Sequence, residues 1–160
     1  MASTTFSGPV TSTNGFIGAL TGNVTGNVTG NVTGNIAGSG SITHTPTAIN
    51  ATATATAAQV ATGYITSTSV GTVTITLPTG TLLGAALGAT QGTVFDLYID
   101  NTAGASVVTV AVATNGILSS GAADTPGSFG DLTIAAGATG LARFTLMFSS
   151  ATAYVFTRTA

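Results

Sequence analysis

Side chains that could carry out chemistry are few in this chain of 160 residues. Six residues carry a formal charge, there is one histidine, and cysteine, lysine, glutamate and tryptophan are absent. The charged residues are Asp96, Asp100, Asp124, Asp131, Arg143 and Arg158, and the histidine is His44. A Ser–His–Asp site would have to be built around His44, and thiol chemistry is impossible without cysteine. The sequence therefore predicts that the protein is not an enzyme and has no catalytic residue and no cofactor.

The same scarcity excludes several kinds of ligand. Two arginines cannot neutralise a run of phosphates, so we expect no nucleic-acid partner. One histidine and four scattered aspartates are a poor ligand set, so we expect no metal site. Thr, Gly, Ser or Asn interrupts every apolar run before it reaches the roughly 18 residues of a membrane-spanning helix, so we expect no membrane partner.

Four of the charged residues fall on predicted strands, where they suit pairing. We predict that Asp96 or Asp100 faces Arg143 or Arg158 across neighbouring strands. An exposed pair of this kind contributes only about 0.2–1 kcal/mol. At an interface between copies of the chain, the pair would fix register more than it would add stability.

The strongest pattern is an internal repeat, TGNV-TGNV-TGNV-TGNI, over residues 21–36. Glycine recurs at every fourth position, and so does an apolar side chain. The apolar positions are Phe16, Leu20, Val24, Val28, Val32 and Ile36. On a strand, a period of four places these residues and the glycines on one face, and the Thr and Asn residues on the other. Alternatively, each Gly-Asn pair makes a turn, because both residues tolerate positive φ.

An apolar stripe with glycine gaps cannot form a core by itself. Three copies wound around one axis would bury it, and glycine would let their backbones approach closely. We therefore predict an N-terminal anchor arm at 1–16, an intertwined stem at 17–40, and a neck and β head domain at 41–160. The alternative for 17–40 is a flexible glycine-rich linker, which gives no reason for an aliphatic residue at every fourth position.

Short strands separated by turn signals are predicted over residues 41–160. The clearest is 72–77, where Val73, Ile75 and Leu77 alternate with threonines. Thr79 is placed to cap a short helix over 81–87. Other strands are expected at 52–56, 64–69, 93–101, 107–113, 117–118, 131–135, 141–148 and 153–158, with a helical turn at 57–60 and a loop at 119–130. Eight or so short strands predict an all-β head, either a small sandwich, a jelly roll or a barrel.

Four stretches of the head resemble a domain of structural proteins of tailed bacteriophages, met in capsid decoration proteins, head fibres and tail-associated fibres. They are TITLPT at 74–79, GTVFDLYIDNT at 92–102, the Ala/Val/Thr strand before Asn115-Gly116-Ile117, and Arg143-Phe144 with ATAYVFTR at 151–158. The glycine-rich repeat also looks like phage fibre stems. The resemblance covers about residues 56–158, and it implies a homotrimer on a virion with no enzymatic activity.

Together these features predict a trimeric capsid decoration (cement) protein or a short head fibre on the outer surface of the capsid. The expected partner is the major capsid protein or another virion structural protein. A trimer that touches several capsid subunits at once gains apparent affinity from multivalency without strong individual contacts. The low charge makes such binding nearly independent of salt.

Two other functions stay open at this point. One is a tail-fibre or adhesin head that binds a host receptor. Glycan sites favour exposed aromatic rings beside Asp or Asn, and the only tyrosines are Tyr64, Tyr98 and Tyr154. The other is an ice-binding or surface-coat protein, suggested by Thr-x-Thr motifs at 43–47, 52–56 and 72–76, although their spacing is unequal. Threonine favours solvated strand faces in any case.

Overall fold

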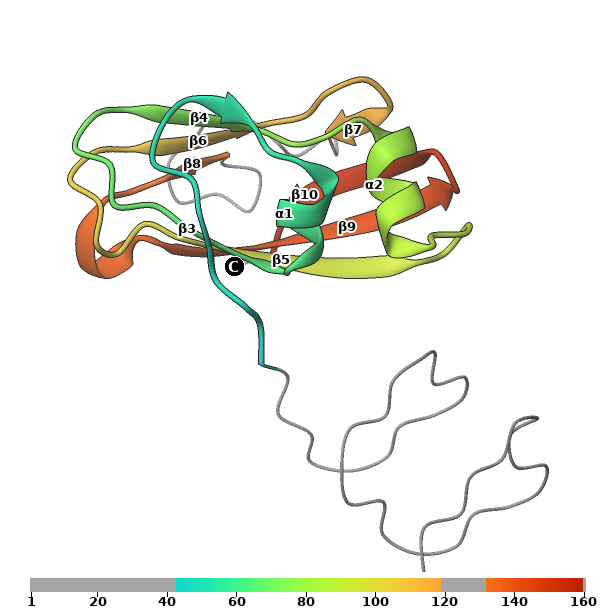
Figure 1. Ribbon diagram of the computed structural model, residues 1–160, viewed down its shortest axis with the longest axis horizontal. Coiled ribbons are helices and arrows are strands. Elements are labelled where there is room, and N and C mark those ends of the chain that lie inside the picture. The colour runs from blue at the N-terminus through green and yellow to red at the C-terminus, as the bar shows by residue number, and fades with distance from the viewer. Residues whose placement is uncertain (1–42, 119–131, 160) are drawn as a thin grey trace, which may run out of the picture. The chain divides into compact units, whose positions relative to one another are not determined.

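The computed structural model describes residues 43–118 and 132–159, which form a mostly β head with mixed sheets (Figure 1). The β class predicted from the sequence is thereby confirmed. Sheet A has the strand order β1 (Thr47–Ala48), β3 (Tyr64–Thr66), β5 (Val94–Asp100), β9 (Leu141–Ser150), β10 (Ala153–Arg158) and β7 (Gly116–Leu118). Sheet B has the order β2 (Ala53–Thr54), β4 (Val73–Thr76), β6 (Val108–Ala111) and β8 (Thr133–Ile134). The predicted anchor arm, the repeat stem and the predicted loop at 119–130 lie outside the described residues.

The chain changes sheet at every connection from β1 to β8, so odd-numbered strands lie in sheet A and even-numbered strands in sheet B. In the first part of the chain, two strands that are neighbours in one sheet are therefore separated along the sequence by one strand of the other sheet. They run parallel in the pairs β1–β3, β3–β5, β2–β4 and β4–β6. Antiparallel pairing comes late in the chain, where β8 pairs with β6 and β9 enters between β5 and β10. The sandwich, jelly-roll and barrel architectures expected from the sequence are antiparallel. Turn signals show where a strand ends, but they do not show that the next strand joins the other sheet.

One hydrophobic core contains the inward positions of both sheets, which Figure 1 shows as two layers. Most of the side chains that the alternating patterns placed inward are buried: Val73, Ile75, Leu77, Leu97, Ile99, Val108, Val110, Leu132, Ile134, Phe144, Leu146 and Phe148. The rings of Phe144 and Phe156 stack with centroids 4.8 Å apart, which joins the two strands of the final hairpin. Phe95 and Val112, also expected to point inward, are only partly buried at the margin of the core.

Two short helices, α1 (Ala57–Ala61) and α2 (Gly80–Leu87), lie in contact on connections from sheet B to sheet A. Thr79 caps α2 as predicted, because its hydroxyl accepts a hydrogen bond from the N–H of Leu82 at 3.3 Å. Thr56 caps α1 in a reciprocal arrangement with Gln59. Gly84 lets α2 lie against the turn between β9 and β10, since a side chain there would overlap the carbonyl oxygen of Ala151.

Asn101 links the two sheets from a fully buried position at the end of β5. Its side-chain nitrogen donates to the carbonyl oxygens of Ser106 at 2.9 Å and of Ala135 at 3.0 Å, and lies 3.3 Å from that of Ile134 in sheet B. Its backbone N–H donates to Gly140 at 2.6 Å. One side-chain amide therefore joins the loop between β5 and β6 to the end of β8 and the residue that follows it, and satisfies carbonyl groups of both segments.

Candidate functional site

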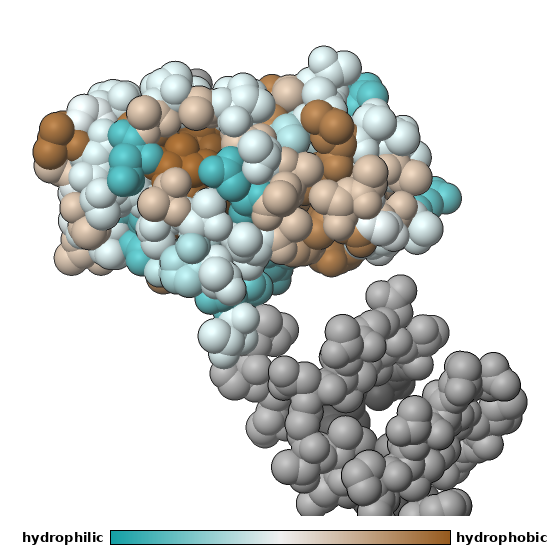
Figure 2. All heavy atoms as spheres, in the orientation of Figure 1, coloured by the Kyte–Doolittle hydropathy of each residue, from teal (hydrophilic) through white to brown (hydrophobic). Residues whose placement is uncertain are grey.

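The two sheets present different side chains on their outer faces, which are turned away from the core. On sheet B the outer positions are small: Thr54, Thr74, Thr76, Thr109 and Ala111. On sheet A they carry larger apolar and aromatic side chains: Tyr64, Val94, Tyr98, Ile117, Leu141, Met147 and Val155. We call these positions of sheet A, with Asp96, Asp100, Arg143 and Thr145 among them, the outer face of sheet A. The visible surface in Figure 2 is largely pale, with scattered hydrophilic residues and several hydrophobic patches among them.

Four large hydrophobic side chains on the outer face of sheet A are more than half exposed. The exposed fractions are 56% for Val94, 53% for Leu141, 53% for Met147 and 52% for Ile117. Val94 lies directly opposite Met147 in the β5–β9 register, and Met147 lies opposite Val155 in the hairpin. With Ile117 opposite Val155, the side chains of Val94, Met147, Val155 and Ile117 form a continuous apolar strip across β5, β9, β10 and β7, and Leu141 lies apart at the other end of β9. Isolated surface hydrophobic residues would need no explanation, but a continuous strip does.

The first described residues of the chain lie on this same face, because Thr43 and His44 line a hollow together with Tyr64, Tyr98 and Leu141. The Nδ1 of His44 donates to the carbonyl oxygen of Thr62 at 2.9 Å. Its ring lies 5.8 Å from the ring of Tyr98, at a tilt of 45°. Gly63, at a φ of +76°, makes room for the imidazole, since a Cβ there would overlap the ring. His44 is therefore packed in place, with its side chain partly buried.

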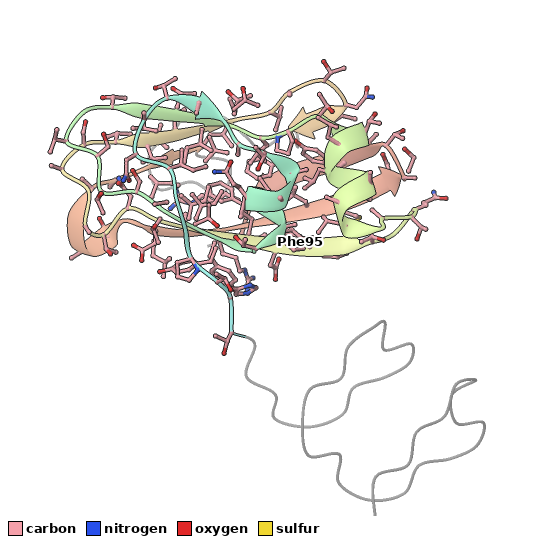
Figure 3. The ribbon with its side chains drawn as sticks, in the orientation of Figure 1. Phe95 is labelled. Atoms are coloured by element: carbon pink, nitrogen blue, oxygen red, sulfur yellow. The ribbon has the colours of Figure 1, made fainter. Side chains whose placement is uncertain are left out.

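Two hollows open on either side of the contact between His44 and Tyr98, and both residues line both hollows. The larger, of about 420 Å³, is also lined by Val94, Phe95 and Asp96. The smaller, of about 390 Å³, is also lined by Thr43, Tyr64 and Leu141. Figure 3 shows side chains projecting from the side of sheet A that faces away from sheet B, and labels Phe95 on β5. The arrangement combines aromatic rings, aliphatic side chains and the carboxylate of Asp96.

Tyr64 and Asp100 form the polar end of the face. The hydroxyl of Tyr64 donates to Asp100 at 2.5 Å, and Thr102 donates to the same carboxylate through its hydroxyl at 2.6 Å and its N–H at 2.8 Å. These donors, Thr102 first and Tyr64 second, lower the pKa of Asp100 below its ordinary value. The same hydrogen bond raises the pKa of Tyr64. At neutral pH the pair therefore consists of a carboxylate and a neutral phenol.

The lowered pKa of Asp100 predicts a loss of stability in acid. The folded-state pKa lies below the unfolded-state value, so the contribution is fully present above the unfolded pKa and is lost as pH falls through the folded one. We expect unfolding in urea to require less denaturant at pH 3 than at pH 6, and Asp100→Asn to reduce this difference. The contribution is below about 1 kcal/mol, because the carboxylate is partly exposed. An identical pH dependence in Asp100→Asn would contradict the assignment.

The charged residues predicted to pair occupy two sides of sheet A. Asp96 lies opposite Thr145, whose hydroxyl donates to it at 2.7 Å, and Asp100 lies opposite Leu141. Arg143 shares this face, one pleat from each aspartate, and its Nε donates to the hydroxyl of Thr159 at 3.1 Å.

Arg158 lies instead on the side of β10 that faces the core, opposite Phe144. Its Nη1 donates to the carbonyl oxygen of Thr133 in sheet B at 2.8 Å. Only Arg143 therefore shares a face with the two aspartates, and direct pairing of either aspartate with an arginine stays a prediction.

The three tyrosines have two different roles. Tyr64 and Tyr98 are register partners in the parallel pair β3–β5 and lie side by side on the outer face of sheet A. Tyr154 is fully buried, donates its hydroxyl to the carbonyl of Pro78 at 3.0 Å, and has a pKa raised to about 12 by burial. Sequence reasoning grouped the three tyrosines together. The residues carried no signal that Tyr64 and Tyr98 would meet, because the parallel pairing was not foreseen.

No family model, curated protein or solved structure matches this chain. Within the described residues, no three His, Asp or Glu side chains gather in a way that could hold a metal ion. In the same part of the chain, no helix is long and apolar enough to cross a membrane. The geometry on which a function can be argued is therefore that of the outer face of sheet A.

Proposed function

We propose that this protein is a virion structural protein, either a trimeric capsid decoration (cement) protein or a short head fibre, and that it has no enzymatic activity. The observation that carries this proposal is the set of exposed apolar side chains on the outer face of sheet A, Val94, Ile117, Leu141 and Met147, on a chain with only six charged residues. A free monomer with such a surface would associate with other molecules. The same surface suits a chain that functions within an assembly.

The finer architecture belongs to the same proposal. The head is a small β-sandwich whose two sheets mix parallel and antiparallel strand pairs. Residues 17–40 form a stem in which the apolar side chains of three copies meet. Residues 1–16 anchor the trimer to the outer surface of the capsid, with the major capsid protein or another virion protein as partner. Attachment is cohesive: each copy contributes a modest apolar contact, and three contacts at once raise the apparent affinity. With so little charge, attachment depends little on ionic strength.

Capsid binding tests the proposal directly. Full-length protein added to expanded empty capsids of the phage that encodes it is expected to bind saturably and to raise the capsid melting temperature, because a ligand bound only to the intact shell stabilises it. Binding should change little between low and high salt. Deleting residues 1–40 should abolish attachment while the head, which has its own core, still unfolds cooperatively. A full-length chain that leaves capsids unbound and their melting temperature unchanged would overturn the proposal.

The second candidate function is a receptor-binding head, and the tyrosines of the outer face favour it. Tyr64 and Tyr98 lie beside His44, Asp96 and Asp100 and border two hollows. Aromatic rings beside carboxylates are the groups that bind sugar rings and their hydroxyls. Retained binding to host cells without binding to capsids, together with loss of cell binding in Tyr98→Ala, would select this function over decoration.

A further inference from the structure

We infer that the outer face of sheet A is the surface through which the heads of neighbouring copies pack, so that its occupant is a second copy of this chain. The inference rests on the proposed homotrimer and adds to it. It assigns the contact to named residues of the head, whereas the sequence located self-association only in the repeat. The observations behind it are the apolar strip, the charges on the face and the place where the chain enters the head.

The apolar strip is the first observation. Val94, Met147 and Ile117 are each more than half exposed in the single chain, and Val94 and Met147 are direct neighbours across β5 and β9. Sheet B offers the internal comparison, because its outer positions are occupied by threonine and alanine. In both sheets the outer residues alternate along each strand with residues of the same buried core. The fold therefore does not require the two outer faces to carry different side chains. Val and Met side chains on a sheet face add to stability only if another surface covers them and removes their apolar area from water.

The charges on the face suit a copy of the same chain better than a partner of one sign. Asp96, Asp100 and Arg143 lie together on this face. Two such faces brought together can place the arginine of one copy against an aspartate of the other. Because buried like charges would be costly, this mixture of signs fixes the register in which the two faces meet. It also gives the predicted pairing of Asp96 or Asp100 with Arg143 a place between copies.

The entry point of the chain is the third observation. Thr43 and His44 lie on the outer face of sheet A, and His44 is held there by Thr62 and Tyr98. The 42 residues that precede Thr43, including the repeat, therefore join the head at this face. Copies held together by their repeats would bring these faces to one another at high effective concentration.

Single thiols test the inference, because the natural chain contains no cysteine. Full-length Met147→Cys places a thiol on the outer face of sheet A, and Thr54→Cys is the matched control on the exposed outer side of sheet B. Both thiols are accessible in one copy. In the oligomer, identified by sedimentation velocity, we expect maleimide to label position 147 at least about tenfold more slowly than position 54, because labelling then proceeds through the dissociated fraction. Dilution into the monomer should equalise the rates.

A charge substitution provides the second measurement. Full-length Met147→Asp is expected to raise the dissociation constant of the oligomer by about tenfold or more, because it buries an unpaired carboxylate. Thr54→Asp should leave it unchanged. Equal labelling of positions 147 and 54 in the oligomer would overturn the inference. A chain that is monomeric at every concentration would overturn both the inference and the proposed trimer.

Capsid binding separates the inference from the proposed function. An oligomer in which position 147 is protected but which does not bind capsids supports the inference and overturns the decoration function. An oligomer that binds capsids while position 147 reacts freely supports the decoration function and overturns the inference.

Discussion

Asn101→Asp is expected to unfold the head or to lower its free energy of unfolding by about 3–5 kcal/mol, the usual cost of a buried charge without a partner. The side-chain nitrogen of Asn101 faces the carbonyl oxygens of Ser106, Ile134 and Ala135. An aspartate at this position would turn a carboxylate oxygen toward the same acceptors at a site with no exposed surface. A domain of this size is stable by about 5–15 kcal/mol, so the loss is a large share of the total.

Urea unfolding followed by circular dichroism measures this effect, and Asn50→Asp is the matched control. Asn50 is exposed, and its side-chain oxygen accepts from the N–H of Thr68 at 2.8 Å, a role that aspartate retains. We expect Asn50→Asp to stay within about 0.5 kcal/mol of the natural chain. Equal stabilities for the two variants would show that the amide of Asn101 does not hold the loops together.

Replacing the four aliphatic residues of the repeat by serine is expected to convert the full-length protein from a trimer to a monomer. The variant carries Val24→Ser, Val28→Ser, Val32→Ser and Ile36→Ser, which keeps length and charge. Each buried aliphatic side chain contributes roughly 1.5–3 kcal/mol. Four losses per copy raise the dissociation constant by more than about a thousandfold. Sedimentation velocity over a range of concentrations gives the measurement.

The control for this variant changes the other face of the repeat. Replacing the threonines at positions 21, 25, 29 and 33 by serine alters the same number of residues but leaves the apolar stripe intact. The stem interpretation predicts an unchanged trimer for this control. If the aliphatic-to-serine variant also keeps its full mass, the repeat is a linker and the stem interpretation is wrong.

Local features of the head could be predicted because their causes are local. The alternation of Val73 and Ile75 with threonine predicts one buried face, and both residues are buried. Thr79 before a run of small residues predicts a helix start, and its hydroxyl caps α2. Asn115 before Gly116 predicts a turn, and Asn115 adopts a φ of +63°. Each of these outcomes depends on a few neighbouring residues, whose side chains and backbone angles are coupled directly.

The strands expected at 141–148 and 153–158 form a hairpin whose turn is shorter than the sequence predicts. Ser149 and Ser150 were expected in the turn, but β9 continues through Ser150, and the turn is reduced to the residues at 151–152. Serine is a common turn residue, so the local signal favoured an earlier end. The strand is prolonged by its pairing with β10, in which Ala153 lies opposite Ser150, and by the contact of this turn with α2.

The sequence by itself determined the weak charge, the short alternating strands, the capped helix and a repeat that has no core of its own. Only the tertiary structure decided that consecutive strands alternate between two sheets, and this winding creates the candidate site. It makes Tyr64 a neighbour of Tyr98, sets Val94 against Met147, and carries His44 onto the same face. Alternation along one strand distinguishes an inner from an outer face, but which outer faces share a sheet depends on pairing between segments distant in sequence.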